Sequence, residues 1–247
     1  MDRRQAIRAA TALTLGAVAA GCDAPQEPPT TPLTPSSPGA VASSATPTPL
    51  GEIRHGPRSG HKVALTFHGQ GDPALVGRLL DELTRARVKV TVLAVGTWLT
   101  ESPELARRVL RDGHDLGNHT QHHADIKRMT PARAQAEIAD CAHALTALTG
   151  SIGRWFRPSQ TQYATARIKA AAARVGYPSC LSYDVDSLDY TDPGADAVVA
   201  NTMKAIRPGS IVSLHFGHAA TISAIAPLIT GLRGRGLTPV TMTELMA

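Results

Sequence analysis

Short apolar runs alternate with segments of helical periodicity from residue 62 onward. The first run spans residues 63–67, and apolar side chains follow it at helical spacing: Leu75, Val76, Leu79, Leu80 and Leu83. Apolar residues at i, i+3 and i+4 line one face of an amphipathic helix, whereas a short apolar run bounded by turn residues is typical of a buried strand. The pattern predicts a strand followed by a helix.

The same unit recurs along the rest of the chain. Further strands are predicted at residues 88–95, 116–119, 155–157, 179–184, 210–215 and 237–240, and helices at residues 103–110, 131–148, 164–175, 196–206 and 220–235. Parallel strands need a crossover connection, so regular alternation indicates a parallel sheet. The fold class we predict is α/β, a distorted (β/α) barrel of about seven parallel strands with outer helices.

The first residues have the pattern of an export signal. Three arginines within the first eight residues precede an uncharged run from Ala9 to Ala20, which is too short to cross a bilayer as a mature helix. Residues 19–22, Ala-Ala-Gly-Cys, resemble a bacterial lipobox. We expect residues 1–21 to be a signal peptide and Cys22 to carry lipid. The Arg3-Arg4 pair resembles a loose twin-arginine signal, so the Sec and Tat routes both stay open.

A linker is predicted next. The segment from Asp23 to about Leu50 is rich in Pro, Ser, Thr and Ala, and it has too few apolar groups to offset the entropy of ordering. We expect residues 22–60 to be a lipid-anchored linker and residues 61–247 to be the folded domain. The lipid would hold an exported protein at the outer face of the cytoplasmic membrane.

The composition is that of an ordinary globular protein. With 43% hydrophobic and 18% charged residues among 247, the chain can bury a core, which excludes global disorder. The formal net charge is +5 and part of it lies in the signal segment; no basic stripe follows, so we expect no nucleic-acid partner. Three cysteines are too few for a disulfide scaffold, and whether Cys141 and Cys180 pair stays open. We expect a monomer.

Chemistry-bearing side chains gather where the predicted strands end. Six of the ten histidines lie there, namely His68, His119, His122, His123, His215 and His218. In parallel α/β barrels the active site is built at the carboxyl ends of the strands. His119 and His123, at positions i and i+4, can share one divalent ion if the segment turns helically. The clustering indicates a metal or proton-transfer site.

The segment GHDLGNHTQHH, residues 113–123, closely resembles the second motif of polysaccharide deacetylases, the NodB-homology family of carbohydrate esterases. The other motifs of the family follow in order, as LTFHGQGDP at residues 65–73, RWFRP at 154–158, YDVDSLDY at 183–190 and IVSLH at 211–215. Several motifs in the correct order are far more specific than one. The resemblance implies a metal-dependent hydrolase that removes N-acetyl groups from amino sugars of cell-wall or related polysaccharide.

The second motif implies the metal site. Its two histidines, His119 and His123 here, bind a divalent metal in the family, for which we expect zinc. The first motif departs from the pattern, because His68 and Gly69 stand where the family has a catalytic base and a metal-binding aspartate. Either Asp72 supplies the third ligand and His68 is the base, a role that suits a neutral imidazole, or His68 completes a three-histidine site.

The remaining motifs imply further roles. Arg157 and Asp189 would form a charge pair that orients and tunes the base, and His215 would be the general acid. Leu214 would line the acetyl pocket, and Tyr190 stands where the family usually has tryptophan. We therefore expect an N-deacetylase whose partner is an N-acetylated polysaccharide. Two alternatives stay open: a tethered carbohydrate-binding pseudoenzyme without turnover, and an amide hydrolase of small molecules.

Overall fold

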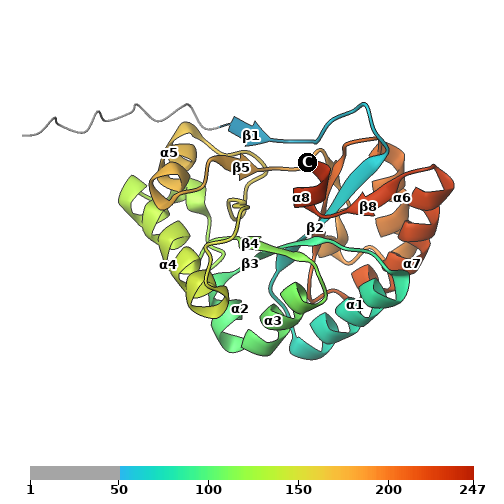
Figure 1. Ribbon diagram of the computed structural model, residues 1–247, viewed down its shortest axis with the longest axis horizontal. Coiled ribbons are helices and arrows are strands. Elements are labelled where there is room, and N and C mark those ends of the chain that lie inside the picture. Colours follow the sequence, from blue (N-terminus) through green and yellow to red (C-terminus); the bar gives the residue numbers. More distant parts are fainter. Residues whose placement is uncertain (1–50) are drawn as a thin grey trace, which may run out of the picture. The chain divides into compact units, whose positions relative to one another are not determined.

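The computed structural model describes residues 51–247 (Figure 1). The predicted signal peptide, Cys22 and most of the predicted linker lie outside the described residues and stay predictions. Among the described helices, none has both the length and the apolar character needed to cross a membrane.

Parallel strands form the centre of the fold. The main sheet has the order β4-β3-β2-β7-β6, and β8 pairs with the beginning of β2. The bounds are β2 Lys62–Gly69, β3 Thr91–Ala94, β4 Asp115–Asn118, β6 Val185–Asp186, β7 Ile211–His215 and β8 Thr238–Val240. A separate parallel pair consists of β1 (Gly51–Ile53) and β5 (Ser179–Leu181). Single bridges through Phe156 link β4 to β5.

Helices surround these strands, as Figure 1 shows. They are α1 Pro73–Ala86, α2 Gly96–Glu101, α3 Pro103–Arg111, α4 Pro131–Thr149, α5 Ala166–Val175, α6 Ala195–Ala205, α7 Ala219–Gly234 and α8 Met242–Leu245, with 3-10 turns η1 Ile126–Arg128 and η2 Asp189–Thr191. The predicted parallel α/β fold with outer helices is confirmed. The strands that the structure describes do not join into one continuous closed sheet, so the barrel is distorted.

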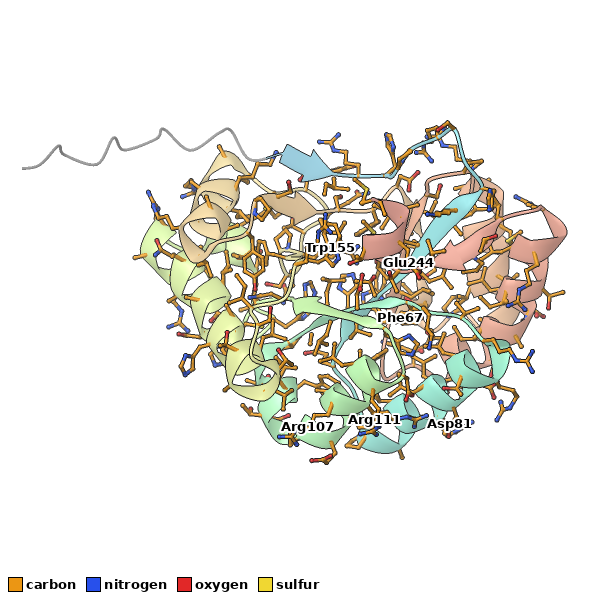
Figure 2. All side chains as sticks on the ribbon, in the orientation of Figure 1. Phe67, Asp81, Arg107, Arg111, Trp155 and Glu244 are labelled. Carbon is orange, nitrogen blue, oxygen red and sulfur yellow. The ribbon has the colours of Figure 1, made fainter. Side chains whose placement is uncertain are left out.

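The main core lies between the sheet and its outer helices. Val76, Leu79 and Leu80 of α1 are buried, as their helical spacing predicts, and they belong to the same cluster as Phe67 of β2 and Leu214 of β7. Phe67 is labelled in the interior of the molecule in Figure 2. Burial of a large apolar side chain contributes roughly 1.5–3 kcal/mol, so this cluster holds β2 and β7 in place under the site described below.

Some elements differ from the predicted ones. Residues 155–157 form only the bridges of Phe156 instead of a strand, and α2 and β6 have no predicted counterpart. Elements of two to six residues are too short to show a period. β1 lies within the residues predicted as linker; its backbone pairs with β5, and the Glu52 carboxylate accepts a hydrogen bond from the Ala164 N–H at 2.6 Å.

Both cysteines of the described region are free thiols. Cys141 lies on α4 and Cys180 on β5, and each side chain is fully buried. Burial raises the pKa of both thiols to about 12. They therefore act as small apolar core residues, and the open question of a Cys141–Cys180 disulfide is answered by two unpaired thiols.

Candidate metal and acid–base site

Three strand ends bring the histidines together. His68 is the penultimate residue of β2 and pairs in register with His215, the last residue of β7. Their imidazole rings stack with centroids 4.2 Å apart and an interplanar angle of 26°. His119 follows β4 directly, and its Nε2 lies 2.8 Å from His68 Nδ1. Residues that are far apart in sequence thus meet at the carboxyl edge of one sheet.

His68, His119 and His123 form a group that can hold a metal ion. Their ligand nitrogens all lie within 4.8 Å of one another, and this is the one such group found among residues 51–247. Burial lowers the pKa of His68 and of His119 well below the ordinary imidazole value, and burial also lowers the pKa of His123. The rings are therefore neutral, as metal ligation requires. Imidazole donors suit zinc and several other transition metals, so the residues fit the metal that the sequence implies.

Hydrogen bonds set the orientation of His119. Its Nδ1 lies 2.9 Å from the carbonyl oxygen of Arg157, which can only accept, so Nδ1 carries the proton. The lone pair is then on Nε2, which faces the other two histidines. A backbone carbonyl in this position is a common outer partner of metal-binding histidines because it fixes the ring and its tautomer.

Arg157 is a buried cation without a carboxylate partner. Its side chain is fully buried, and burial lowers its pKa to about 10. The guanidinium donates to Thr66 Oγ1 at 2.8 Å and to the Ser182 carbonyl at 3.1 Å, and its NH1 lies 3.3 Å from His68 Nε2. Within residues 51–247 no ion pair includes Arg157. A positive charge that has already lost its hydration thus faces a neutral ring.

This contact selects a tautomer of His68. A guanidinium can only donate, so His68 Nε2 accepts and the proton of the neutral ring lies on Nδ1, where it is donated to His119 Nε2. Nδ1 is the nitrogen that faces the site, so a role as ligand or as base requires the proton to leave Nδ1. The Ser213 hydroxyl, 3.1 Å from His68 Nε2, is the acceptor that makes the other tautomer accessible.

Asp189 pairs with His215, and the predicted pair with Arg157 is not formed. Asp189 Oδ1 lies 2.7 Å from His215 Nδ1, and Oδ2 accepts from the His215 N–H and from Thr221 Oγ1, each at 2.7 Å. Burial opposes ionisation of Asp189, but the hydrogen bonds from His215 and Thr221 bring its pKa below the ordinary value. η2 places the carboxylate beside the end of β7, out of ion-pair distance of Arg157. Because Asp189 binds Nδ1 of His215, the other ring nitrogen, Nε2, is free for proton transfer.

Asp72 does not join the histidines in the structure. Its carboxylate caps α1, where Oδ1 accepts from the N–H groups of Ala74 and Leu75 at 2.9 and 3.1 Å. The predicted ligand set of His119, His123 and Asp72 therefore differs from the observed group, in which His68 takes the third place. Gly69 has no room for a ligand side chain, because a Cβ there would lie 2.7 Å from Val92 Cγ1.

Two hollows meet at the histidines. One, of about 440 Å³, extends past Trp98 and Glu101, and the other, of about 260 Å³, extends past Gln160 and Tyr190; His68, His123 and His215 line both. Tyr190 is 49% exposed and lines the smaller of the two hollows. Leu214 differs from its predicted role: it is fully buried and lines neither hollow, because alternation along β7 turns it into the core.

His218 forms a second histidine–aspartate pair that the motifs do not indicate. Its Nδ1 lies 2.9 Å from Asp192 Oδ1, and its ring lies 6.1 Å from that of His215. Asp189 and Asp192 are three residues apart, as are His215 and His218, and this equal spacing is the signal that sequence analysis missed. His122 is directed away from the group, toward Glu137 at 2.9 Å.

Comparison with known proteins places this arrangement in a family. The profile described as "Polysaccharide deacetylase" matches residues 55–179. The chain is 33% identical over 206 residues to the chitooligosaccharide deacetylase of Bradyrhizobium sp. (strain ANU 289), covering 76% of this chain and 93% of that one. It is 28% identical over 194 residues to a peptidoglycan-N-acetylglucosamine deacetylase of Bacillus cereus, covering 74% and 87%.

Solved structures give the same result. A CE4 family pseudoenzyme from Bacillus anthracis is similar with a TM-score of 0.74 at 25% identity, covering 82% of this chain and 70% of that chain. A mutant of that pseudoenzyme with restored enzymatic activity is similar with a TM-score of 0.75, also at 25% identity, and covers 82% and 72%.

The unpaired charge of Arg157 predicts the stability of two matched variants. Glu and Gln reach about as far as the Nε2 atom of His68 and have the same shape, so His68→Glu and His68→Gln differ only in charge. We expect the Glu variant to be more stable by about 1–3 kcal/mol, because its carboxylate pairs with a guanidinium that is already desolvated. Urea denaturation in the presence of a chelator measures the difference. If the Gln variant were as stable as the Glu variant, the result would show that the buried charge of Arg157 does not need a countercharge at position 68.

Adjacent histidines provide a matched test of the metal group. We expect His123→Ala to weaken zinc binding by at least about 100-fold, because a group of three ligands has none to spare. His122→Ala removes the neighbouring ring, which contacts Glu137, and is expected to leave zinc affinity within about twofold. Competition titration against a zinc chelator measures both affinities. Equal losses in the two variants would place the metal elsewhere.

Proposed function

The chain belongs to the polysaccharide deacetylase family, and we propose that it hydrolyses the N-acetyl groups of amino sugars in cell-wall or related polysaccharide with a divalent metal, for which zinc is the candidate. The observation that carries the proposal is the His215–Asp189 pair at 2.7 Å, next to a three-histidine group at the meeting point of two hollows. The relatives named as chitooligosaccharide and peptidoglycan deacetylases support this class of substrate.

His68, His119 and His123 would hold the metal. We assign His68 to the metal and not to proton abstraction, because its Nδ1 is within ligand distance of the other two nitrogens and His215 already supplies a free nitrogen for proton transfer. A divalent metal, when bound, polarises the amide carbonyl and lowers the pKa of water. Ser213 would accept the proton on His68 Nε2, and Arg157 would keep its bonds to Thr66 and Ser182.

His215 would carry the proton. Asp189 holds the Nδ1–H, so Nε2 can take a proton from the attacking water and give it to the amine, which is a poor leaving group unless protonated. Asp189 is fully buried and its negative charge stabilises the protonated ring during this transfer. One histidine–aspartate pair would thus act first as base and then as acid.

The two hollows suit a polymer. Apart from the shared histidines they are lined by different segments, near Trp98 and Glu101 in one and near Gln160 and Tyr190 in the other, which offers room for more than one sugar unit. The exposed ring of Tyr190, 5.3 Å from that of His215, offers a face for stacking against a sugar next to the reacting group.

We further propose that lipid on Cys22 tethers an exported protein to the membrane. The lipobox-like residues 19–22 and the Pro- and Ser-rich segment after them support this arrangement. The expected result of Cys22→Ser is release of the protein from the membrane fraction, measured by fractionation and immunoblotting. Unchanged membrane association of this variant would count against the anchor.

Acetate release from N-acetylglucosamine oligomers, with zinc supplied, tests the proposed reaction. We expect His215→Ala to lower turnover by about 10²–10⁴-fold, the usual contribution of acid–base catalysis, while zinc stays bound. His218→Ala, whose ring pairs with Asp192, is the control and is expected to retain far more activity. If His215→Ala kept full activity, His215 would not be the proton carrier.

A carbohydrate-binding protein without turnover is the second candidate. The observation that favours it is that His68 and Gly69 replace both acidic residues of the first motif, while the similar Bacillus anthracis protein is itself a pseudoenzyme. The same assay separates the two candidates. No acetate from the wild-type protein with zinc supplied, together with retained binding to the polymer, would establish this second function.

A further inference from the structure

A further polar cavity lies at the opposite end of β3 and β4 from the histidine group. Its volume is about 310 Å³, and its lining comes from the end of α1, the end of α3 and the segments before the two strands. His114 lies here, directly before β4, whereas His119 directly follows that strand. The cavity is therefore separate from the proposed deacetylase site.

His114 presents a buried donor that has no partner. The ring is 4% exposed, and its Nδ1 accepts a hydrogen bond from the Val90 N–H at 3.2 Å. A backbone N–H can only donate, so Nδ1 bears the lone pair and the proton of the neutral ring is on Nε2. Burial and the nearby Lys89 lower the pKa of His114 to about 4, which keeps the ring neutral. Nε2 is buried and has no hydrogen-bond partner among residues 51–247.

Cations surround the same cavity. Arg87, Lys89 and Arg111 line it, and all three are exposed; Arg111 is labelled at α3 in Figure 2. The Lys89 ammonium donates to the backbone carbonyl of Asp112. The carboxylate of Asp112 is held by Arg108 at 3.0 Å, and none of the three cations has an ion-pair partner within residues 51–247.

We propose that this cavity binds a phosphate group. One oxygen would accept from His114 Nε2 and the others would meet Lys89 and the two arginines, whose donors match an anion with several oxygens. The Lys89 side chain is long and exposed, so it can move to admit the group. A single water would satisfy Nε2 but would not engage the three cations that line the cavity.

Titration calorimetry of the full chain with inorganic phosphate, at constant ionic strength set by chloride, tests the site. We expect saturable binding of one phosphate, and Lys89→Gln should weaken it by about tenfold or more. Lys127→Gln removes the same charge from the exposed turn η1 and should change the affinity by less than about twofold. Neither lysine supports the core, so both variants are expected to fold. Absence of saturable binding, or equal weakening in both variants, would overturn the proposal.

Nitrogen-15 spectra of histidine-labelled protein locate the contact. Phosphate should shift the Nε2–H signal of His114 and leave the Nδ1–H signal of His215 unchanged. A titration with dimethyl phosphate, a diester with one negative charge, distinguishes the source: tighter binding of the diester indicates a phosphate within a larger molecule, and tighter binding of inorganic phosphate indicates a free anion. A His114 signal that neither compound shifts would mean that only water meets this nitrogen. Acetate release does not enter any of these readouts, so the test is independent of the proposed deacetylation.

Discussion

The parallel pairing of β2 with β7 is the constraint on which the site depends. The register pairs His68 with His215, so side chains 147 positions apart by residue number stack at 4.2 Å. β3 pairs with the other edge of β2 and with β4, which brings His119 to the same level. Side chains alternate along a strand, and the same pairing that exposes His68 and His215 turns Phe67 and Leu214 into the core. The same strand pairing therefore determines both the packing of the core and the geometry of the site.

Arg157 gives the site its unusual electrostatics. Burial lowers the pKa of His68 and of His119, and the fully buried guanidinium beside them further disfavours a positive charge on either ring. Among the four histidines His68, His119, His123 and His215 of residues 51–247, only His215 pairs with a carboxylate, that of Asp189. Three neutral imidazoles thus lie on one side and a histidine–aspartate pair on the other, a division that suits metal binding next to acid–base chemistry.

Much of the fold could be predicted from the sequence because its long helices carry strong local signals. Thr130, Pro131 and Gly150 mark the ends of α4, and the structure has that helix at Pro131–Thr149 with the Thr130 side chain and a left-handed Gly150 as caps. β1, β6 and α2 lack such signals, because their positions depend on pairing or packing with distant segments. Asp72, considered from the sequence only as a metal ligand, instead caps α1 at Pro73.

The sequence predicts which residues belong to the site better than it predicts which of them pair with each other. His119 and His123 are recognisable by spacing and His215 by its place at a strand end, but the partner of Asp189 depends on where η2 lies relative to β7. Two cations, Arg157 and a protonated His215, are both chemically suitable partners for a buried carboxylate. Only the three-dimensional arrangement selects His215, at 2.7 Å, and leaves Arg157 facing His68.

We propose that His68 binds the metal where the family has a carboxylate. An anomalous difference map from crystals grown with zinc, recorded at the zinc edge, tests this assignment. We expect one ion at about 2.0–2.1 Å from a nitrogen of each of His68, His119 and His123, with His215 still paired to Asp189. An ion bound by Asp72 in place of His68, or no ion at the histidines, would contradict it.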